Sequence, residues 1–227
     1  MSNPLIIFDC DGVLIDSEAI YLDVEFSFLA SKKIDIDRDW YIGEFMALGM
    51  DKWRAKLSDL LLAHTGAALT DAEYDALKLE GRTRVLNELT TIAGIETLLD
   101  NLALPCCVAS STSMKFLPGK LKQAGLAGYF GDHVFSGDQV ENGKPAPDLF
   151  LLAARTMGFD AQDCIVIEDS ANGVRGGKAA GMVTVGFTGG GHAGPAHAPR
   201  LVGAGADHVI DSHGALAHWL ASRTGKI

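Results

Sequence analysis

The sequence predicts an α/β protein built on a parallel sheet, and two features of the 227-residue chain support this fold class. A short apolar run, Leu5–Phe8, is followed by a long stretch in which apolar residues have helical spacing. From about residue 106 onward, short apolar runs alternate with helical patterns. Such alternation is typical of strands joined by helical crossovers in a parallel sheet.

The first apolar run ends on two carboxylates. Leu5–Phe8 has the continuous apolar character of a buried parallel strand, and Gly12 allows a sharp turn after it. Asp9 and Asp11 therefore project from the carboxyl end of a strand, where open α/β sheets bind ligands. Two carboxylates so close repel each other, and a hard divalent cation with oxygen ligands would keep both ionised. A plain turn that ends a strand explains this segment equally well.

The next stretch, from about residue 17 to residue 89, predicts helices throughout. It shows no strand alternation, and its apolar residues recur every three or four positions. These residues include Ile20, Val24, Phe28, Leu57, Leu60, Leu61, Tyr74, Leu77, Val85 and Leu89.

Three later segments place polar groups where a strand ends or in a stiff loop. Residues 106–109 form an apolar run that ends on hydroxyls, beginning with Ser110. Lys144 lies in a loop with glycine and proline around it, and residues 164–167 form a second apolar run that ends on adjacent acids, Glu168 and Asp169. The alternation is completed by helical patterns at residues 117–124, 149–157 and 174–180 and by apolar runs at residues 134–135 and 183–187.

Taken together, these four segments resemble the motifs of the haloacid dehalogenase superfamily of aspartate-dependent phosphohydrolases. Within it, they are most similar to the branch that contains β-phosphoglucomutase and small sugar-phosphate phosphatases. The resemblance extends from about residue 5 to residue 209, and the order of the four motifs makes it specific. It implies a Rossmann-like core formed by residues 1–16 and 90–227, with a helical cap inserted at residues 17–89.

The resemblance also implies catalytic roles. Asp9 would be the nucleophile that carries the phosphoryl group as an aspartyl-phosphate. Asp11 would be the general acid and base, with its backbone carbonyl on the metal. Ser110, with the amide of Ser111, would hold the phosphoryl oxygens, and Lys144 would neutralise their charge. No Gly-x-Ser-x-Gly elbow surrounds Ser110, so a serine nucleophile is not expected.

The implied metal site contains Asp9, Asp11, Glu168 and Asp169, with Mg²⁺ as the expected cofactor because all of these ligands are oxygen. Asp169 is expected to bind the ion directly, and Glu168 either directly or through water. Acids at the N-terminus of a helix are the alternative interpretation of that pair. Dehalogenases of the superfamily lack the second acid of the first motif and need no metal, so Asp11 favours phosphoryl transfer over carbon–halogen cleavage.

Residues of the helical segment are expected to select the leaving group. The segment at residues 47–50 resembles the family's cap specificity loop, which makes Gly49 and Lys52 candidates for substrate binding. Mutase members carry a histidine at the position aligned with Tyr21, so water is the expected acceptor here. The predicted function is a phosphatase for a small sugar or sugar-acid phosphate such as 6-phosphogluconate. A β-phosphoglucomutase-like mutase and a non-catalytic module that binds a phosphometabolite remain alternatives.

Composition narrows the range of partners. The 29 acidic residues exceed the 19 basic ones, and the formal net charge of −10 argues against nucleic acid and anionic membranes as partners. A small phosphorylated metabolite is the expected partner, and the chain is expected to be a monomer or weak homodimer. The spacing of Cys10, Cys106, Cys107 and Cys164 fits neither a zinc site nor a disulfide framework, so we expect reduced core residues. No apolar stretch is long enough to span a bilayer, and the first strand follows without a basic and apolar leader, so we expect a cytoplasmic protein. No histidine near Cys10 would activate it as a nucleophile.

The glycine-rich stretch at residues 188–194 is predicted to be a loop on the ligand side of the sheet. His192 and His197 could touch substrate there, but we expect them to be solvated loop residues.

Overall fold

The computed structural model describes residues 3–45 and 48–225. In these residues a parallel sheet of six strands has the order β3-β2-β1-β4-β5-β6. The strands are β1 (Leu5–Phe8), β2 (Cys106–Ser110), β3 (Val134–Ser136), β4 (Cys164–Glu168), β5 (Val183–Phe187) and β6 (His208–Ile210). The sheet confirms the α/β fold class expected from the alternating pattern.

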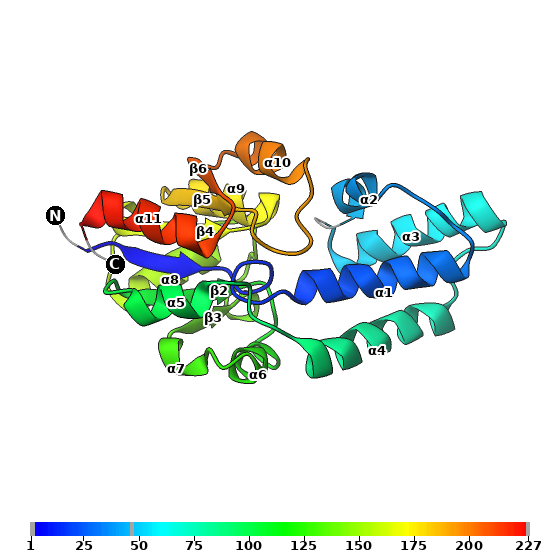
Figure 1. Cartoon of the computed structure of the whole chain (residues 1–227), viewed down its shortest axis with the longest axis horizontal. Coiled ribbons are helices and arrows are strands. Elements are labelled where there is room, and N and C mark those ends of the chain that lie inside the picture. The colour runs from blue at the N-terminus through cyan, green and yellow to red at the C-terminus, as the bar shows by residue number, and fades with distance from the viewer. Residues whose placement is uncertain (1–2, 46–47, 226–227) are drawn as a thin grey trace.

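Helices cover both faces of the sheet (Figure 1). One face carries α5 (Ile95–Asn101), α6 (Leu117–Gln123), α7 (Ala127–Phe130) and α11 (His213–Thr224). The other carries α8 (Asp148–Met157), α9 (Ala171–Ala179) and α10 (His197–Ala204), and two short 3-10 helices are η1 (Gly137–Gln139) and η2 (Ala161–Asp163).

The core therefore has three layers, with the sheet between two layers of helices, and the sequence of the central strand β1 fits this arrangement. Ile6 and Phe8 point into one apolar cluster and Leu5 and Ile7 into the other, and all four are fully buried. Successive side chains of a strand alternate between faces, so a strand between two helical layers needs apolar residues at every position. The uninterrupted apolar run therefore specifies a central strand.

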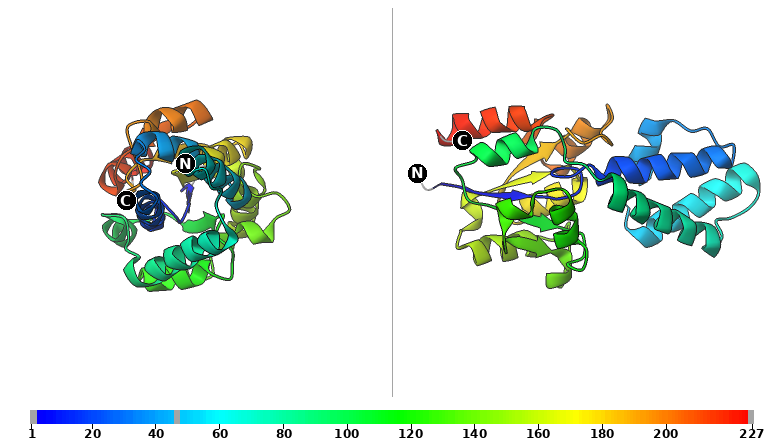
Figure 2. Two further views of the ribbon diagram at one scale, coloured as in Figure 1. Left: turned by 90° about the vertical axis from the view of Figure 1, so that its right-hand side faces the viewer. Right: turned by 60° about the horizontal axis from the view of Figure 1, so that its bottom comes forward.

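Of the five helices that the described residues form between β1 and β2 in the sequence, all but α5 project from the carboxyl ends of the strands (Figures 1 and 2). The projecting helices are α1 (Ser17–Ser31), α2 (Arg38–Phe45), α3 (Met50–Thr65) and α4 (Asp71–Glu88). They share an apolar cluster of their own, in which the rings of Tyr41 and Phe45 stack with centroids 4.1 Å apart. We refer to α1–α4 as the helical unit.

Two neighbouring backbone segments join the helical unit to the sheet. The amide of Asp16 donates to Thr90 O at 3.0 Å, and the amide of Ile92 donates to Leu14 O at 3.0 Å. Ile15 and Thr91 form an antiparallel bridge between them. The chain therefore leaves the sheet and returns to it at one place, beside the end of β1.

The pattern of apolar runs located β1–β5, α6, α8 and α9 to within about three residues, and it did not identify α5, α7, β6 or α11. It also did not identify α10 as a helix, because Gly194 and Pro195 before it and Pro199 in its first turn are typical of a loop. In the described residues no helix is both long and apolar enough to cross a membrane.

Candidate active site

A cavity of about 490 Å³ lies where the carboxyl ends of β1, β2 and β4 face the helical unit. Its floor comes from the sheet and the loops after the strands, and Ile42, Leu48 and Gly49 contribute from the helical unit. The structure brings together seven sequence-predicted residues here: Asp9, Asp11, Ser110, Ser111, Lys144, Glu168 and Asp169.

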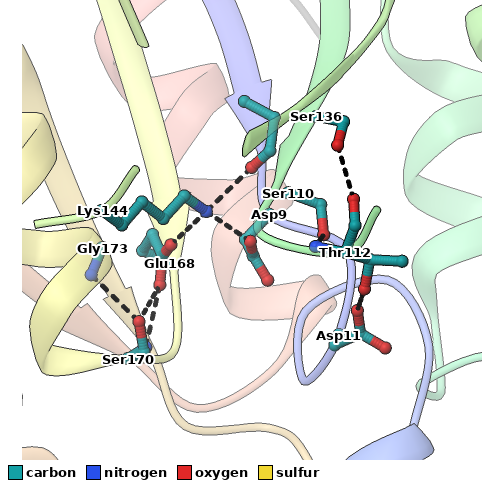
Figure 3. A network of polar contacts seen from close by, with 10 residues as sticks. Asp9, Asp11, Ser110, Thr112, Ser136, Lys144, Glu168, Ser170 and Gly173 are labelled. Carbon is teal, nitrogen blue, oxygen red and sulfur yellow. Dashed lines mark hydrogen bonds and ion pairs between the residues drawn. The ribbon is translucent and has the colours of Figure 1, made fainter. Parts of the chain in front are cut away.

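Lys144 is the centre of the polar network (Figure 3). Its Nζ donates to Asp9 Oδ1 at 2.5 Å, to Glu168 Oε1 at 2.6 Å and to the carbonyl of Ala109 at 2.8 Å. Only 3% of the lysine side chain is exposed. Burial by itself lowers the pKa of Lys144, but the two carboxylates outweigh it and raise that pKa above its ordinary value. The lysine is therefore a fixed positive charge.

Glu168 is held at both of its oxygens. Oε1 accepts from Lys144, while Oε2 accepts from the amide and the hydroxyl of Ser170, each at 2.9 Å. Ser170 also caps α9 by accepting from the amide of Gly173 at 3.0 Å. A Cβ on Gly173 would lie 1.7 Å from Glu168 Oε1, so only glycine leaves room for this carboxylate. These contacts hold the Glu168 carboxylate in place beside Lys144.

Asp9, Glu168 and Asp169 form a buried acidic cluster whose ligand atoms all lie within 4.8 Å of one another. Burial raises the pKa of Asp9 well above its ordinary value; the charge of Lys144 opposes this shift, and Glu168 and Asp169 add to it. Clustered carboxylates with oxygen-only donors suit a hard divalent cation such as Mg²⁺. The cluster therefore fits the expected metal site, in which Asp11 was expected to take part through its backbone carbonyl and not through its side chain.

Asp11 has partners of its own. Lys120 Nζ donates to Oδ1 at 2.6 Å, Thr112 Oγ1 donates to Oδ2 at 2.6 Å, and the Ser17 hydroxyl also donates to Oδ1. Burial by itself raises the pKa of Asp11, but the charge and hydrogen bond of Lys120, with the two hydroxyls, bring that pKa below its ordinary value. These contacts favour the ionised form of Asp11 and keep its side chain separate from the acidic cluster.

The loop after β2 carries the predicted hydroxyls. Ser110 is buried, and its Oγ accepts from the amide of Thr112 at 3.0 Å. Ser136 Oγ donates to Thr112 O at 2.8 Å and fixes the loop from the next strand (Figure 3). Ser110 and Ser111 line the same cavity as Asp9 and Lys144.

The two loop histidines are buried, so the expectation that they are solvated was wrong. His192 is 2% exposed, and its Nε2 lies 3.0 Å from Asp169 Oδ2. His197 Nε2 lies 2.5 Å from the carbonyl of Asp169. The glycines around them allow this close packing, since a Cβ on Gly12, at φ +82°, would lie 2.0 Å from Asp169 Oδ2. Both histidines therefore support Asp169.

The predicted substrate-binding residues have different positions. Gly49 lines the cavity, whereas Lys52 is exposed and lines neither of the two cavities near the site. Lys52 is next to Trp53, which is on the buried face of α3, and one residue turns a helix by about 100°. The structure therefore does not bring Lys52 to the site. Ala47, in the same predicted loop, lies outside the described residues.

A second cavity of about 380 Å³ adjoins the first at Asp11 and Glu18. Tyr21, Glu25, Lys78, Arg82 and Lys120 contribute polar groups to it. Tyr21 is the position at which mutase members were expected to carry histidine. Its phenol ring packs against Gly81 of α4, where a Cβ would lie 2.7 Å from the ring.

Four residues of the site were not identified from the sequence: Ser17, Thr112, Lys120 and Arg200. Thr112 follows the Ser110–Ser111 motif and could have been included with it. The sequence around Lys120 does not mark it as a site residue, because a lysine on a helix is usually solvated. Its place in the site depends on how α6 packs on the sheet. Arg200 lies on a helix that was not predicted.

Comparisons with known proteins agree with this geometry. Residues 4–181 match the family model described as haloacid dehalogenase-like hydrolase. The chain is 27% identical to the 6-phosphogluconate phosphatase of Escherichia coli K12 over 86% of this chain and 87% of that one. It is 31% identical to the fructose-1-phosphate phosphatase YqaB of the same strain, over 79% of this chain and 94% of that one.

Among solved structures, a haloacid dehalogenase family hydrolase of Deinococcus radiodurans R1, determined with bound phosphate and sodium, superposes with a TM-score of 0.84. It is 31% identical to this chain, and the match covers 97% of this chain and 96% of that one.

Proposed function

The chain belongs to the haloacid dehalogenase-like hydrolase family, and we propose that it is a Mg²⁺-dependent phosphatase that hydrolyses a small phosphorylated metabolite through an aspartyl-phosphate on Asp9. The proposed substrate is a sugar or sugar-acid phosphate. Two curated phosphatases among its relatives, named for 6-phosphogluconate and fructose 1-phosphate, support this substrate class.

One observation carries the proposal: the two carboxylates of a single loop face one cavity in opposite environments. Asp9 lies in the acidic cluster with its Oδ1 on Lys144, while Asp11 lies outside the cluster on Lys120 and Thr112. A nucleophile needs charge neutralisation around the phosphoryl group, and an acid–base group needs an ionised form that can exchange a proton. The loop supplies both.

In the proposed reaction, an Asp9 oxygen attacks phosphorus and the bond from phosphorus to the ester oxygen breaks. Asp11, in its protonated form, donates its proton to the departing alkoxide and is left ionised. In the second step, Asp11 takes a proton from water, the resulting hydroxide attacks the phosphorus of the aspartyl-phosphate, and inorganic phosphate leaves with Asp9 restored. Lys144, Ser110 and the Ser111 amide would hold the phosphoryl oxygens throughout, because charge stabilisation and alignment supply most of the rate in phosphoryl transfer.

The acidic cluster is the proposed metal site. Asp9 and Asp169 would bind Mg²⁺ directly, together with the backbone carbonyl of Asp11, and Glu168 would act mainly by holding Lys144. When bound, Mg²⁺ would neutralise the charge on the phosphoryl oxygens. His192 and His197 would hold Asp169 in place for it.

The helical unit is the proposed cap, with residues 17–89 as the cap domain and residues 1–16 and 90–227 as the core. It closes one side of the cavity with Ile42, Leu48 and Gly49, which lie opposite the sheet. A cap over a phospho-enzyme excludes bulk water and strengthens the local electrostatics. A cytoplasmic location is part of the proposal and is supported by the four free cysteines.

The test is phosphate release from a panel of phosphate esters, with Mg²⁺ and with a chelator. The panel contains 6-phosphogluconate, fructose 1-phosphate, glucose 6-phosphate, β-glucose 1-phosphate and p-nitrophenyl phosphate. We expect Mg²⁺-dependent release, with loss of at least about 10⁴-fold in Asp9→Asn, because removal of a catalytic nucleophile costs this much or more. Asp9→Asn is nearly isosteric, so purification alongside the wild type also controls for contaminating phosphatases.

Other outcomes would redirect the proposal. Conversion of β-glucose 1-phosphate to glucose 6-phosphate without phosphate release, in the presence of a bisphosphate activator, would show a mutase. Retained activity in Asp9→Asn would exclude the aspartyl-phosphate. No turnover of any ester, with or without activator, would leave a module that only binds phosphometabolites.

A further inference from the structure

Arg200 lies on α10, and its half-buried side chain reaches the helical unit. Nη1 makes a long hydrogen bond of 3.4 Å to Ile42 O on α2. Gly43 leaves space for the guanidinium, since a Cβ there would lie 2.9 Å from Nη2. In the part of the chain that the structure describes, no carboxylate oxygen lies within 4.0 Å of it. The guanidinium therefore retains most of its hydrogen-bonding capacity.

Arg200 also lines the active-site cavity. Arg200 contributes to the wall that contains His197 and Leu201, and the sheet side of this cavity carries Asp9, Ser110 and Lys144. A volume of about 490 Å³ is in the range of small-molecule sites, so there is room for more than a phosphoryl group. A ligand whose phosphate lies against Ser110 has Arg200 on the wall of the same cavity.

Other cations near the site differ from Arg200 in their partners. Lys144 and Lys120 are neutralised by Asp9, Glu168 and Asp11. In the second cavity, Lys78 pairs with Asp75 at 2.8 Å.

Arg82 also borders the second cavity, but it is exposed and lies over the ring of Phe116. The same cavity contains Glu25, which does not line the active-site cavity and would repel a ligand anion once ionised. Arg200 is thus the cation best placed to receive an anion from a ligand in the active-site cavity.

We propose that Arg200 binds a second oxyanion of the substrate, so that the preferred substrates are phosphate monoesters that also carry a carboxylate, that is, sugar-acid phosphates. This inference rests on the proposed phosphatase function and narrows its substrate class. The planar guanidinium matches a carboxylate with two parallel hydrogen bonds, which a lysine cannot reproduce. A second phosphate shares this chemistry, and the test separates the two.

The experiment compares two esters that differ only at one end. 6-Phosphogluconate has a carboxylate at C1, and glucitol 6-phosphate has a CH₂OH group there with the rest of the chain unchanged. The measured quantity is the ratio of kcat/KM for the two esters. Fructose 1,6-bisphosphate against fructose 1-phosphate provides the same comparison for a second phosphate.

We expect the wild type to favour 6-phosphogluconate and Arg200→Gln to reduce this preference by about 10–100-fold, because hydrogen bonds to charged groups contribute about 1.5–3 kcal/mol. Arg200→Lys should retain only part of the preference. The matched control is Arg155→Gln, an exposed arginine of α8 that borders neither cavity, and it should leave the ratio unchanged.

A purely structural role for Arg200, as a contact between α10 and α2, would give a different result. Arg200→Gln would then lower the melting temperature and affect both esters alike, with no change in the ratio, and the proposal would be wrong. A loss of preference in Arg82→Gln instead would assign the anion site to the second cavity and would also overturn it. If the wild type preferred only the bisphosphate and not 6-phosphogluconate, the oxyanion bound by Arg200 would be a second phosphate, and the proposed carboxylate would be wrong.

Binding provides a measurement that does not depend on turnover. Calorimetric titration of both esters into Asp9→Asn, and into Asp9→Asn with Arg200→Gln, should show tighter binding of 6-phosphogluconate that the second substitution removes. Equal affinities of the two esters for Asp9→Asn would overturn the role of Arg200 even if the chain proved to have no phosphatase activity. Absence of turnover with a preserved difference in affinity would contradict the phosphatase alone.

Discussion

Charged groups are arranged in opposite ways in the sheet and in the helical unit. At the strand ends, Lys144 forms ion pairs with Asp9 and Glu168, and the side chains of the three residues are 3%, 10% and 1% exposed. In the helical unit, ion pairs are on the surface, and Arg54 and Asp71 are 40% and 88% exposed. A buried pair that loses one partner leaves an uncompensated charge, whereas an exposed pair loses little.

The two regions therefore differ in how well they tolerate a change of charge. The buried charges are fixed by the sheet, and each of them depends on the others, so the phosphoryl-transfer site tolerates little change. The surface of the helical unit can change charge at small cost to folding. Substrate selection by groups at the border between the two regions, such as Arg200 and Gly49, is consistent with this division.

The largest effect is expected from removal of the buried cation. Lys144→Met should reduce turnover at least about 100-fold, because a group that stabilises developing charge is lost. It should also lower the free energy of unfolding by about 3–5 kcal/mol, because Asp9 and Glu168 lose their shared partner. Phosphate release and urea unfolding measure the two effects.

The matched variant in the helical unit is Arg54→Met, which breaks an exposed pair. Its free energy of unfolding should stay within about 0.5 kcal/mol of the wild type. Equal losses of stability in the two variants would remove the distinction between the regions. A near-normal rate in Lys144→Met would place this lysine outside the reacting centre.

A smaller effect, visible in the pH profile, is expected at the border. Lys120 holds the pKa of Asp11 down against burial, so Lys120→Met should raise that pKa. The ionised form that acts as a base would then appear only at higher pH. We expect the acidic limb of the kcat profile to move upward by about 1–3 pH units. Lys122→Met, on the same helix, is the control, and an unmoved limb would mean that Asp11 does not control it.

The smallest effect is expected within the helical unit. Burial raises the pKa of Glu25 from 4.5 to about 7, with Tyr41 and Trp53 opposing it in part. A carboxyl whose folded-state pKa is raised contributes stability that is complete below the unfolded pKa and is lost as pH rises through about 7. Glu25→Gln should therefore match the wild type near pH 4.5 and exceed it at pH 8 by about 1–3 kcal/mol. Equal free energies of unfolding at both pH values would contradict a raised pKa for the half-buried Glu25.

Site residues that belong to a local sequence pattern could be predicted, whereas residues placed by contacts between distant segments could not. Asp9, Asp11, Glu168 and Asp169 were recognisable because an apolar run followed by acids and glycine is a local signal of a strand end. Their convergence follows from the parallel sheet, since its carboxyl ends lie on one edge.

Residues placed by packing between distant segments could not be predicted in the same way. Lys120 reaches Asp11 only after α6 packs on the sheet, and the burial of His192 depends on missing side chains at Gly12 and Gly190. Lys52 was expected to bind substrate because it follows the predicted specificity loop. The burial of Trp53 and Leu57 sets the orientation of α3, however, and leaves Lys52 exposed. Arg200 required both α2 and α10 to be in place.

The paired backbone segments at Leu14–Asp16 and Thr90–Ile92 affect how the chain folds. β1 and β2 are neighbours in the sheet although the whole helical unit separates them in sequence, and closing so long a loop costs entropy. Once the helical unit has packed, however, the two segments that enter and leave it lie side by side. The entropy cost of pairing β1 with β2 is then close to that of a much shorter connection. The same geometry allows evolution to lengthen or replace the insertion while the strand register stays as it is.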